Sequence, residues 1–193
     1  MTTDPSKKDK PQVMSQEVPQ DGLTRCPWCE SKSLDRHYHD TEWGVPMHDD
    51  RDLLELLTLE GAQAGLSWST VLAKREGYKR IFKNFDAKKI VAFSEADIAA
   101  AMADPGIVRN KLKINSTIGN ARAYLAVQAK YGSFDAFLWQ VVGGKPIVNK
   151  WKASSHVPAK TAESDAMSKL LLSTGLNLSA PPFAMRSCRQ VVW

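Results

Sequence analysis

The chain has 193 residues, of which 43% are hydrophobic, so it is long and apolar enough to bury a core as one domain or two closely apposed lobes. Lysine and arginine number 26 against 21 acids, and the resulting net charge of +5 and pI near 9.1 suit a polyanionic partner such as nucleic acid, although a basic enzyme without one remains the alternative. Three cysteines, two of them in a Cys-x-x-Cys pair, exclude a secreted disulfide framework and favour a reducing compartment or a metal site.

The first part of the chain, residues 1–22, is polar, interrupted by prolines and without a periodic apolar face. Such a segment cannot bury enough surface to order itself, and we expect a disordered tail. It also lacks the apolar stretch of a signal peptide, and no run of about 18 apolar residues follows it that could cross a membrane. The sequence therefore predicts a cytoplasmic protein without a membrane partner.

The folded part is predicted to be all-α. Helical spacing of apolar residues predicts helices over residues 51–61, 68–83, 87–92, 95–103, 111–129, 133–141 and 161–173. Side chains that commonly cap helices precede them: Asp49 or Asp50, Ser67, Asp86, Ser94, Ser133, and Lys160 or Thr161. The only strand-like passage is 141–148, and two glycines interrupt it.

The segment RCPWCESKSLDRHYHD contains ligand types that suit zinc. Thiolates and imidazoles hold zinc tetrahedrally, and Cys26, Cys29, His37 and His39 lie within this short stretch. Their spacing matches no common zinc finger. Half of a metal site and no metal site at all both remain open.

The helix over 51–61 carries an acid on its apolar face. Glu60 continues the stripe of Leu53, Leu56 and Leu57 at helical spacing, so its carboxylate is predicted to point inward. A buried carboxylate needs a partner, a raised pKa or a ligand that supplies hydrogen bonds. Pairing with an arginine is the plainer of these alternatives.

Aromatic residues flank this helix in the sequence. Tyr38, Trp43 and Trp68 could all reach one pocket beside Glu60 if the first two helices pack together. Ordinary core packing is the alternative for each ring.

Residues 104–125, DPGIVRNKLKINSTIGNARAYL, indicate a tight proline–glycine turn that leads into a long helix. With the helix before it, this segment resembles a helix–hairpin–helix, whose turn and helix N-terminus bind the phosphate backbone without reading sequence. Gly106, Lys111 and Lys113 are the candidate DNA-binding residues. A plain αα-hairpin is the alternative, and the aspartate that many such enzymes place after the hairpin is absent, since residues 125–130 read LAVQAK.

Taken together, RCPWC, YHDTEWGVP, LEGAQAGLSWSTVLAKRE, GIVRNKLKI and GNARAYL, in this order and spacing, closely resemble the bacterial DNA-3-methyladenine glycosylase I family. The resemblance runs from about Arg25 to Leu178 and includes FLW at 137–139 and SDAMSK at 164–169. It implies a helix–hairpin–helix glycosylase domain over residues 23–178. It also implies hydrolytic excision of 3-methyladenine from double-stranded DNA by a monomer that flips the base.

The resemblance assigns roles to residues of this chain. Glu60 matches the family's pocket acid and would accept hydrogen bonds from the adenine edge, while Tyr38 and Trp68 would stack on the positively charged base. Leu66 would fill the gap left in the base stack, and Gly65 would let the backbone approach the DNA closely. The family forms no covalent enzyme intermediate, so no Schiff-base lysine is assigned.

The chain departs from the family near its C-terminus. The family's structural zinc is held by residues matching Cys26 and His39 and by a histidine and a cysteine near the C-terminus, so only two of four ligands are present, and Cys188 does not replace one. The codons possible for residues 179–193 can encode the family's own C-terminal segment in another reading frame. We therefore expect these residues to be a frameshifted, non-native tail.

Two alternative functions remain at this level. The altered C-terminus would leave a catalytically impaired DNA-binding remnant of the family if it removes activity. A helix–hairpin–helix lyase acting on oxidised bases is the other, but that chemistry needs a nucleophilic lysine and the aspartate that is missing here.

Overall fold

The computed structural model describes residues 21–149, 156, 158 and 160–177, and within them it contains helices and no strand. The predicted all-α fold is therefore confirmed for the described residues. The expected tails, 1–22 and 179–193, lie outside this range apart from residues 21 and 22. No helix in the described part is both long and apolar enough to cross a membrane.

A short N-terminal helix was not predicted from the sequence. After a single 3-10 turn, η1 (Pro27–Cys29), α1 spans Ser33–Thr41. Helix α1 is almost entirely polar, buries only Asp35 and Tyr38, and has no side-chain cap at Lys32. It therefore lacks the apolar stripe and the cap from which helices are recognised.

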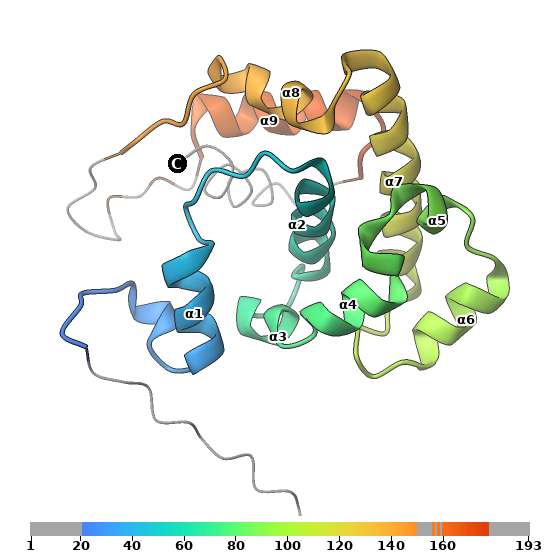
Figure 1. The fold of residues 1–193 in the computed structure, drawn as a ribbon, viewed down its shortest axis with the longest axis horizontal. Coiled ribbons are helices and arrows are strands. Elements are labelled where there is room, and N and C mark those ends of the chain that lie inside the picture. The colour runs from blue at the N-terminus through green and yellow to red at the C-terminus, as the bar shows by residue number, and fades with distance from the viewer. Residues whose placement is uncertain (1–20, 150–155, 157, 159, 178–193) are drawn as a thin grey trace, which may run out of the picture.

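Helix α2 (Asp50–Ala62) is the central element. Asp49 caps it by accepting hydrogen bonds from the backbone N–H groups of Arg51 and Asp52, as one of the two predicted alternatives. Figure 1 shows α2 in the middle of the molecule, with α1 and α3 toward one end and α8 and α9 at the other. The helix is buried on nearly its whole circumference from Leu53 to Glu60, so its polar residues lie inside the protein.

The single helix predicted over 68–83 is wrong, because the structure contains two helices there. Helix α3 spans Trp68–Leu72 and α4 spans Arg75–Ile81, and Lys74 between them has a non-helical backbone. The Lys74 ammonium donates a hydrogen bond of 2.6 Å to the carbonyl of Pro105 in the α6–α7 turn. This hydrogen bond joins distant segments at the break, and local periodicity does not record such a contact.

The remaining elements are η2 (Lys83–Phe85), α5 (Ala87–Val91), α6 (Glu95–Ala103), α7 (Lys111–Tyr131), α8 (Phe134–Trp139), η3 (Gln140–Val142) and α9 (Ala162–Ser173). All of them except η2, which was not predicted, follow the predicted ranges closely. Asp86, Ser94 and Ser133 cap α5, α6 and α8 as predicted, and Thr161 rather than Lys160 caps α9. The strand-like passage 141–148 begins as the end of η3 and forms no strand.

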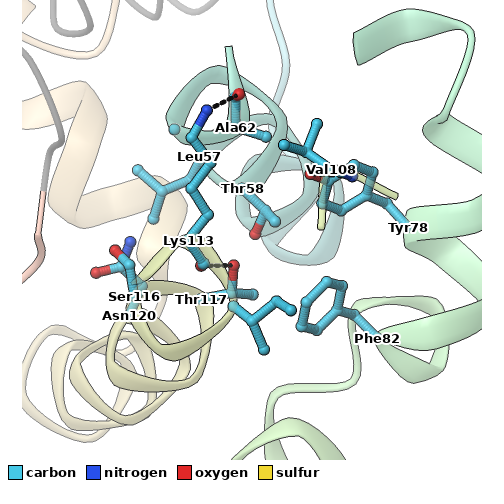
Figure 2. Close-up of a pocket in the computed structure, with 12 residues that line it drawn as sticks. Leu57, Thr58, Ala62, Tyr78, Phe82, Val108, Lys113, Ser116, Thr117 and Asn120 are labelled. Atoms are coloured by element: carbon cyan, nitrogen blue, oxygen red, sulfur yellow. Dashed lines mark hydrogen bonds between the residues drawn. The ribbon is translucent and has the colours of Figure 1, made fainter. Parts of the chain in front are cut away.

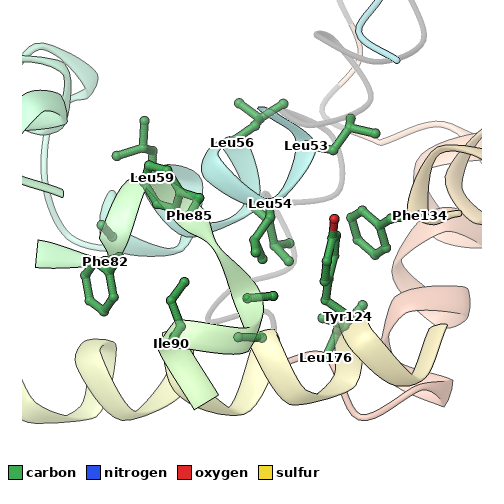
Figure 3. Packing of buried hydrophobic residues seen from close by; sticks show 14 of the residues in the cluster. Leu53, Leu54, Leu56, Leu59, Phe82, Phe85, Ile90, Tyr124, Phe134 and Leu176 are labelled. Carbon is green, nitrogen blue, oxygen red and sulfur yellow. The ribbon is translucent and has the colours of Figure 1, made fainter. Parts of the chain in front are cut away.

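The core lies where α2 meets η2, α5, α7 and α8 (Figure 3). Leu54, Phe85, Ile90 and Phe134 are among its fully buried side chains. Each such side chain contributes roughly 1.5 to 3 kcal/mol relative to an exposed one. Lys83, Asn84 and Phe85 all adopt left-handed φ angles of 53 to 54°, which ends α4 and turns Phe85 into this core.

Asp50 joins α2 to α8 and is expected to matter for stability. Its carboxylate accepts hydrogen bonds from the backbone N–H groups of Phe134 (2.8 Å) and Asp135 (2.7 Å) and from the side chain of Gln128 (2.6 Å). Asp50→Ala leaves these donors without their acceptor, so we expect the free energy of unfolding to fall by about 2 to 3 kcal/mol in urea titrations. Asp52→Ala, an exposed neighbour, is the control and should cost less than about 1 kcal/mol.

Candidate active site

Glu60 and Tyr38 are brought together in the interior by α2 and α1. Glu60 is only 8% exposed and Tyr38 only 5%, so the inward direction predicted for the acid is confirmed. Burial raises the pKa of the Tyr38 hydroxyl far above its usual value, and the nearby charge of Glu60 raises it further. The tyrosine is therefore neutral at any physiological pH.

The rings around this pair form one connected group. Tyr38 contacts Trp68 of α3 with ring centroids 5.1 Å apart and Trp28 at 6.4 Å, and Trp28 contacts Trp43 at 5.6 Å. His39 stacks on Trp43 at 5.2 Å. We call these five residues the aromatic cluster. The sequence predicted that Tyr38, Trp43 and Trp68 could reach one pocket beside Glu60. In the structure Trp68 contacts Tyr38 directly, whereas Trp43 is linked to Tyr38 through Trp28.

Tyr38 and Trp68 touch each other directly, with their planes tilted by 46°. A planar base cannot lie between two rings that are already in contact. A base that uses both rings must either stack on one and meet the edge of the other, or separate them on entry.

Three buried polar atoms on or next to the helices that carry Tyr38, Glu60 and Trp68 have no hydrogen-bond partner among the described residues. They are Oδ1 of Asp35, Oε1 of Gln63 and Nε1 of Trp68. Each unsatisfied buried group costs about 1 to 3 kcal/mol, so a native protein rarely keeps several without a reason. Asp35 and Trp68 bring an unsatisfied acceptor and an unsatisfied donor to the ring pair, which is typical of a site that binds a polar ligand. The sequence reasoning identified neither Asp35 nor Gln63.

Arg75 of α4 fastens the N-terminal helix to the central helix. Its guanidinium donates to both carboxylate oxygens of Glu42, at 2.7 and 2.8 Å, and to the buried carboxylate of Glu55 on α2. Burial alone would lower the pKa of Arg75, but its hydrogen bonds to these two acids raise it above the usual value. This network holds α1, and hence Tyr38, against α2.

The loop between α2 and α3 carries Gly65 and Leu66. Gly65 has a φ of +78°, in the left-handed region that favours glycine, and Leu66 is 39% exposed. The backbone N–H of Leu66 donates to the carbonyl of Gln63 at 2.7 Å, which fixes the turn. An exposed leucine on a short, fixed loop agrees with its predicted role as a wedge, which remains a prediction.

The turn between α6 and α7 contains Gly106 and is packed against α4. A Cβ atom at Gly77 would lie 2.1 Å from the carbonyl oxygen of Gly106, so the two backbones touch and neither position leaves room for a side chain. Asn110 caps α7 and Lys111 is exposed at its first turn. Helix α6, this turn and α7 follow one another along the chain, and a helix–hairpin–helix that binds DNA through Gly106 and Lys111 remains a prediction.

Lys113, predicted to contact DNA, is bonded inside the protein in this structure. Its ammonium donates hydrogen bonds of 2.7 Å to the carbonyls of Ala62 and Ala64, where α2 ends. These carbonyls have no partner within the helix, so the lysine satisfies them. Burial lowers the pKa of this ammonium. A DNA contact would have to use its third donor.

We expect Lys113→Met to lower the free energy of unfolding by about 1 to 2 kcal/mol, because two carbonyls lose a charged donor. Lys111→Met removes an equal charge from the exposed first turn of α7 and should change it by less than about 0.5 kcal/mol. Chemical denaturation of both variants measures the difference. Equal effects would contradict the capping role of Lys113.

A hollow of about 350 Å³, open solvent included, lies between α2, α4 and α7 (Figure 2). Leu57, Thr58 and Ala62 line it, but Glu60 and the aromatic cluster do not. Its two threonine hydroxyl groups are bonded to the backbone: Thr58 donates to the carbonyl of Leu54 and Thr117 to that of Lys113. The hollow is therefore distinct from the candidate site and offers a ligand few free polar groups.

The predicted zinc segment does not form a metal site on its own. Within the described residues no group of three or more histidine, cysteine, aspartate or glutamate side chains could hold a metal ion. Cys29 is buried and its thiol donates to the carbonyl of Cys26, and burial raises its pKa. Nδ1 of His39 lies 2.9 Å from Asp40. Zinc binding through Cys26 and His39 therefore remains a prediction, and Cys188 lies outside the described residues.

Comparisons with known proteins agree with this architecture. The family model of the methyladenine glycosylases matches residues 28–187. The DNA-3-methyladenine glycosylase of Haemophilus influenzae is 46% identical over 152 residues, which are 79% of this chain and 82% of that protein.

Two solved structures are similar throughout. One of a 3-methyladenine DNA glycosylase I is 39% identical, with a TM-score of 0.83 over 87% of this chain and 92% of that one. Another, a variant of such an enzyme in complex with 3-methyladenine, is 31% identical, with a TM-score of 0.83 over 88% of this chain and 91% of that one. The chain belongs to the methyladenine glycosylase family.

Proposed function

We propose that this protein is a base-excision repair enzyme that hydrolyses the N-glycosidic bond of 3-methyladenine in alkylated double-stranded DNA. The observation that carries the proposal is a buried acid, Glu60, near the Tyr38–Trp68 ring pair, to which Asp35 and Trp68 add unsatisfied polar atoms. Relatives named for this activity and a similar enzyme in complex with 3-methyladenine support it.

The selection of the damaged base follows from its charge. 3-Methyladenine is positively charged in the nucleotide, so Tyr38 and Trp68 each attract it by a cation–π contact of roughly 0.5 to 2 kcal/mol. Glu60 accepts hydrogen bonds from the edge of the base, and the ligand then compensates for the desolvation of the acid. Neutral adenine forfeits the charge-dependent part of this attraction.

The base must leave the duplex to reach the site. Tyr38 and Glu60 are almost fully buried, so a base that is stacked in DNA cannot contact them. Flipping costs a few kcal/mol and is easiest for a poorly paired base, which favours lesions. Leu66 on its exposed loop fills the gap in the stack, and Gly65 allows the loop to approach.

Because the charged base is already a good leaving group, bond cleavage needs little acid catalysis. Water attacks C1′ directly and no enzyme-bound intermediate forms, so we propose a monofunctional glycosylase without a lyase step. The protein's contribution is to place the base and to stabilise its charge.

The proposal is tested by incubating the full chain with DNA treated with a methylating agent and measuring released bases by chromatography. We expect free 3-methyladenine, intact DNA strands, and no base from untreated DNA. Binding to alkylated DNA without base release would show instead a catalytically impaired remnant. Strand cleavage that needs no later alkali treatment would show a lyase.

A further inference from the structure

We propose that Asp35 is a second acid of the base site and makes the site selective for a positively charged base. The inference rests on the proposed function, and it concerns a residue that neither the sequence motifs nor the family resemblance singled out. The Asp35 carboxylate of α1 lies beside the Tyr38–Trp68 pair with one oxygen bonded to the protein and one oxygen without a partner.

The position of Asp35 is fixed by two elements. It precedes Tyr38 by three residues on α1, so both side chains lie on the same face of that helix. Its Oδ2 accepts a hydrogen bond from the hydroxyl of Ser69, the residue that follows Trp68 on α3. Asp35 therefore spans the two helices that hold the ring pair.

The burial of Asp35 requires an explanation. The residue is 1% exposed, and its Oδ1 has no hydrogen-bond partner among the described residues. An ionised carboxylate can accept about four hydrogen bonds, and removing it from water without compensation is costly. One hydroxyl group satisfies only part of this demand.

The cation whose charge acts on Tyr38 does not supply the remainder. Arg75 is hydrogen-bonded to Glu42 and Glu55, two other acids. Arg75 is therefore engaged by other acids, and the buried Asp35 carboxylate keeps one oxygen without a hydrogen-bond partner among the described residues. A cation bound beside the ring pair compensates the charge of this carboxylate.

A positively charged methylated purine fits this arrangement. Its charge compensates the Asp35 carboxylate, its amino group can donate to Asp35 Oδ1, and its ring nitrogens can accept from the unsatisfied Nε1 of Trp68. A neutral purine satisfies the hydrogen bonds but leaves the charge of the buried carboxylate uncompensated. Asp35 therefore determines part of the selectivity for a charged base.

Asp35→Asn is the direct test, because the amide oxygen can still accept from Ser69 while the charge is lost. We expect single-turnover excision of 3-methyladenine to slow about 10-fold or more, which corresponds to one charge-assisted hydrogen bond. Binding of a duplex that carries 3-methyl-3-deazaadenine, a neutral isostere, should change less than about two-fold, measured by fluorescence titration. The ratio of the loss in excision rate for the cationic base to the loss in affinity for the neutral base measures how far Asp35 selects for charge.

Three further variants separate charge from structure. Ser69→Ala removes the link between α1 and α3 and should affect the cationic and the neutral base equally, whereas Asp35→Glu keeps the charge and should keep the preference for the cationic base. Asp52→Asn removes an exposed acid of α2 and should change neither measurement. Circular dichroism melting of each variant identifies any that unfold.

Two results overturn the inference. One is parental excision by a folded Asp35→Asn, and the other is an equal loss for both bases in that variant. If Asp35→Asn does not fold, Asp35→Glu decides the question instead. Loss of its preference for the cationic base overturns the inference, and retention of that preference supports it. If the parental chain releases no 3-methyladenine, the proposed function itself fails, which is a different outcome from parental activity that is indifferent to Asp35.

Discussion

Glu60→Gln is expected to slow release of 3-methyladenine from alkylated DNA by about 10- to 100-fold. The substitution keeps the size and shape of the side chain but removes the charge that compensates the cationic base. Because the carboxylate is buried, this interaction is weakly screened by water and salt. Single-turnover rates, with enzyme in excess over damaged sites, measure the effect without a contribution from product release.

Glu76→Gln is the matched control for this variant. Glu76 lies on α4 with 85% of its side chain exposed, so its charge should not influence excision. Circular dichroism should give the same helix content for both variants and the parental chain. If Glu60→Gln released the base at the parental rate, Glu60 would not be the acid that recognises the base.

Arg75→Met is expected to lower the free energy of unfolding by about 3 to 5 kcal/mol, as is typical when one partner of a buried ion pair is removed. The buried Glu55 and the half-buried Glu42 both lose the donor that compensates them. Since Glu42 directly follows α1, the variant should also loosen the helix that carries Tyr38. Urea denaturation followed by tryptophan fluorescence measures the loss.

Lys79→Met provides the comparison for Arg75. Its ammonium lies 3.9 Å from Glu55 and is partly exposed, so its removal should cost no more than about 1 kcal/mol. In the Arg75→Met background, Glu55→Leu should restore part of the lost stability, because it removes the uncompensated buried charge. A loss of less than 1 kcal/mol in Arg75→Met would mean that the network contributes little to stability.

Much of the fold is predictable from local sequence. Helices α5, α6 and α9 combine apolar spacing with the capping residues Asp86, Ser94 and Thr161, and both signals are local. Helix α1 lacks both. At the break between α3 and α4, Lys74 contacts the α6–α7 turn, and Gly77 of α4 packs against the same turn. Such long-range contacts leave no periodic pattern in the chain.

Only part of the site was predictable, because some of its residues are likewise held by contacts between distant segments. The helical stripe of α2 indicates that Glu60 points inward, and the family resemblance gives Tyr38 and Trp68 their roles. Asp35 and Arg75 could not be found in this way, because their partners are 34 and 20 or 33 residues away and on other helices. A polar residue on a polar helix gives no sign of burial until the helix that covers it is placed.

The bonds of Lys113 to the carbonyls of Ala62 and Ala64 have a mechanical consequence. They join the first turn of α7, which follows the α6–α7 turn, to the loop that carries Leu66. A displacement of either segment is transmitted to the other, so the two DNA contacts proposed for these segments, with the phosphate backbone and with the base stack, cannot be adjusted separately. Engineering the loop for a different lesion would therefore require compensating changes at the start of α7.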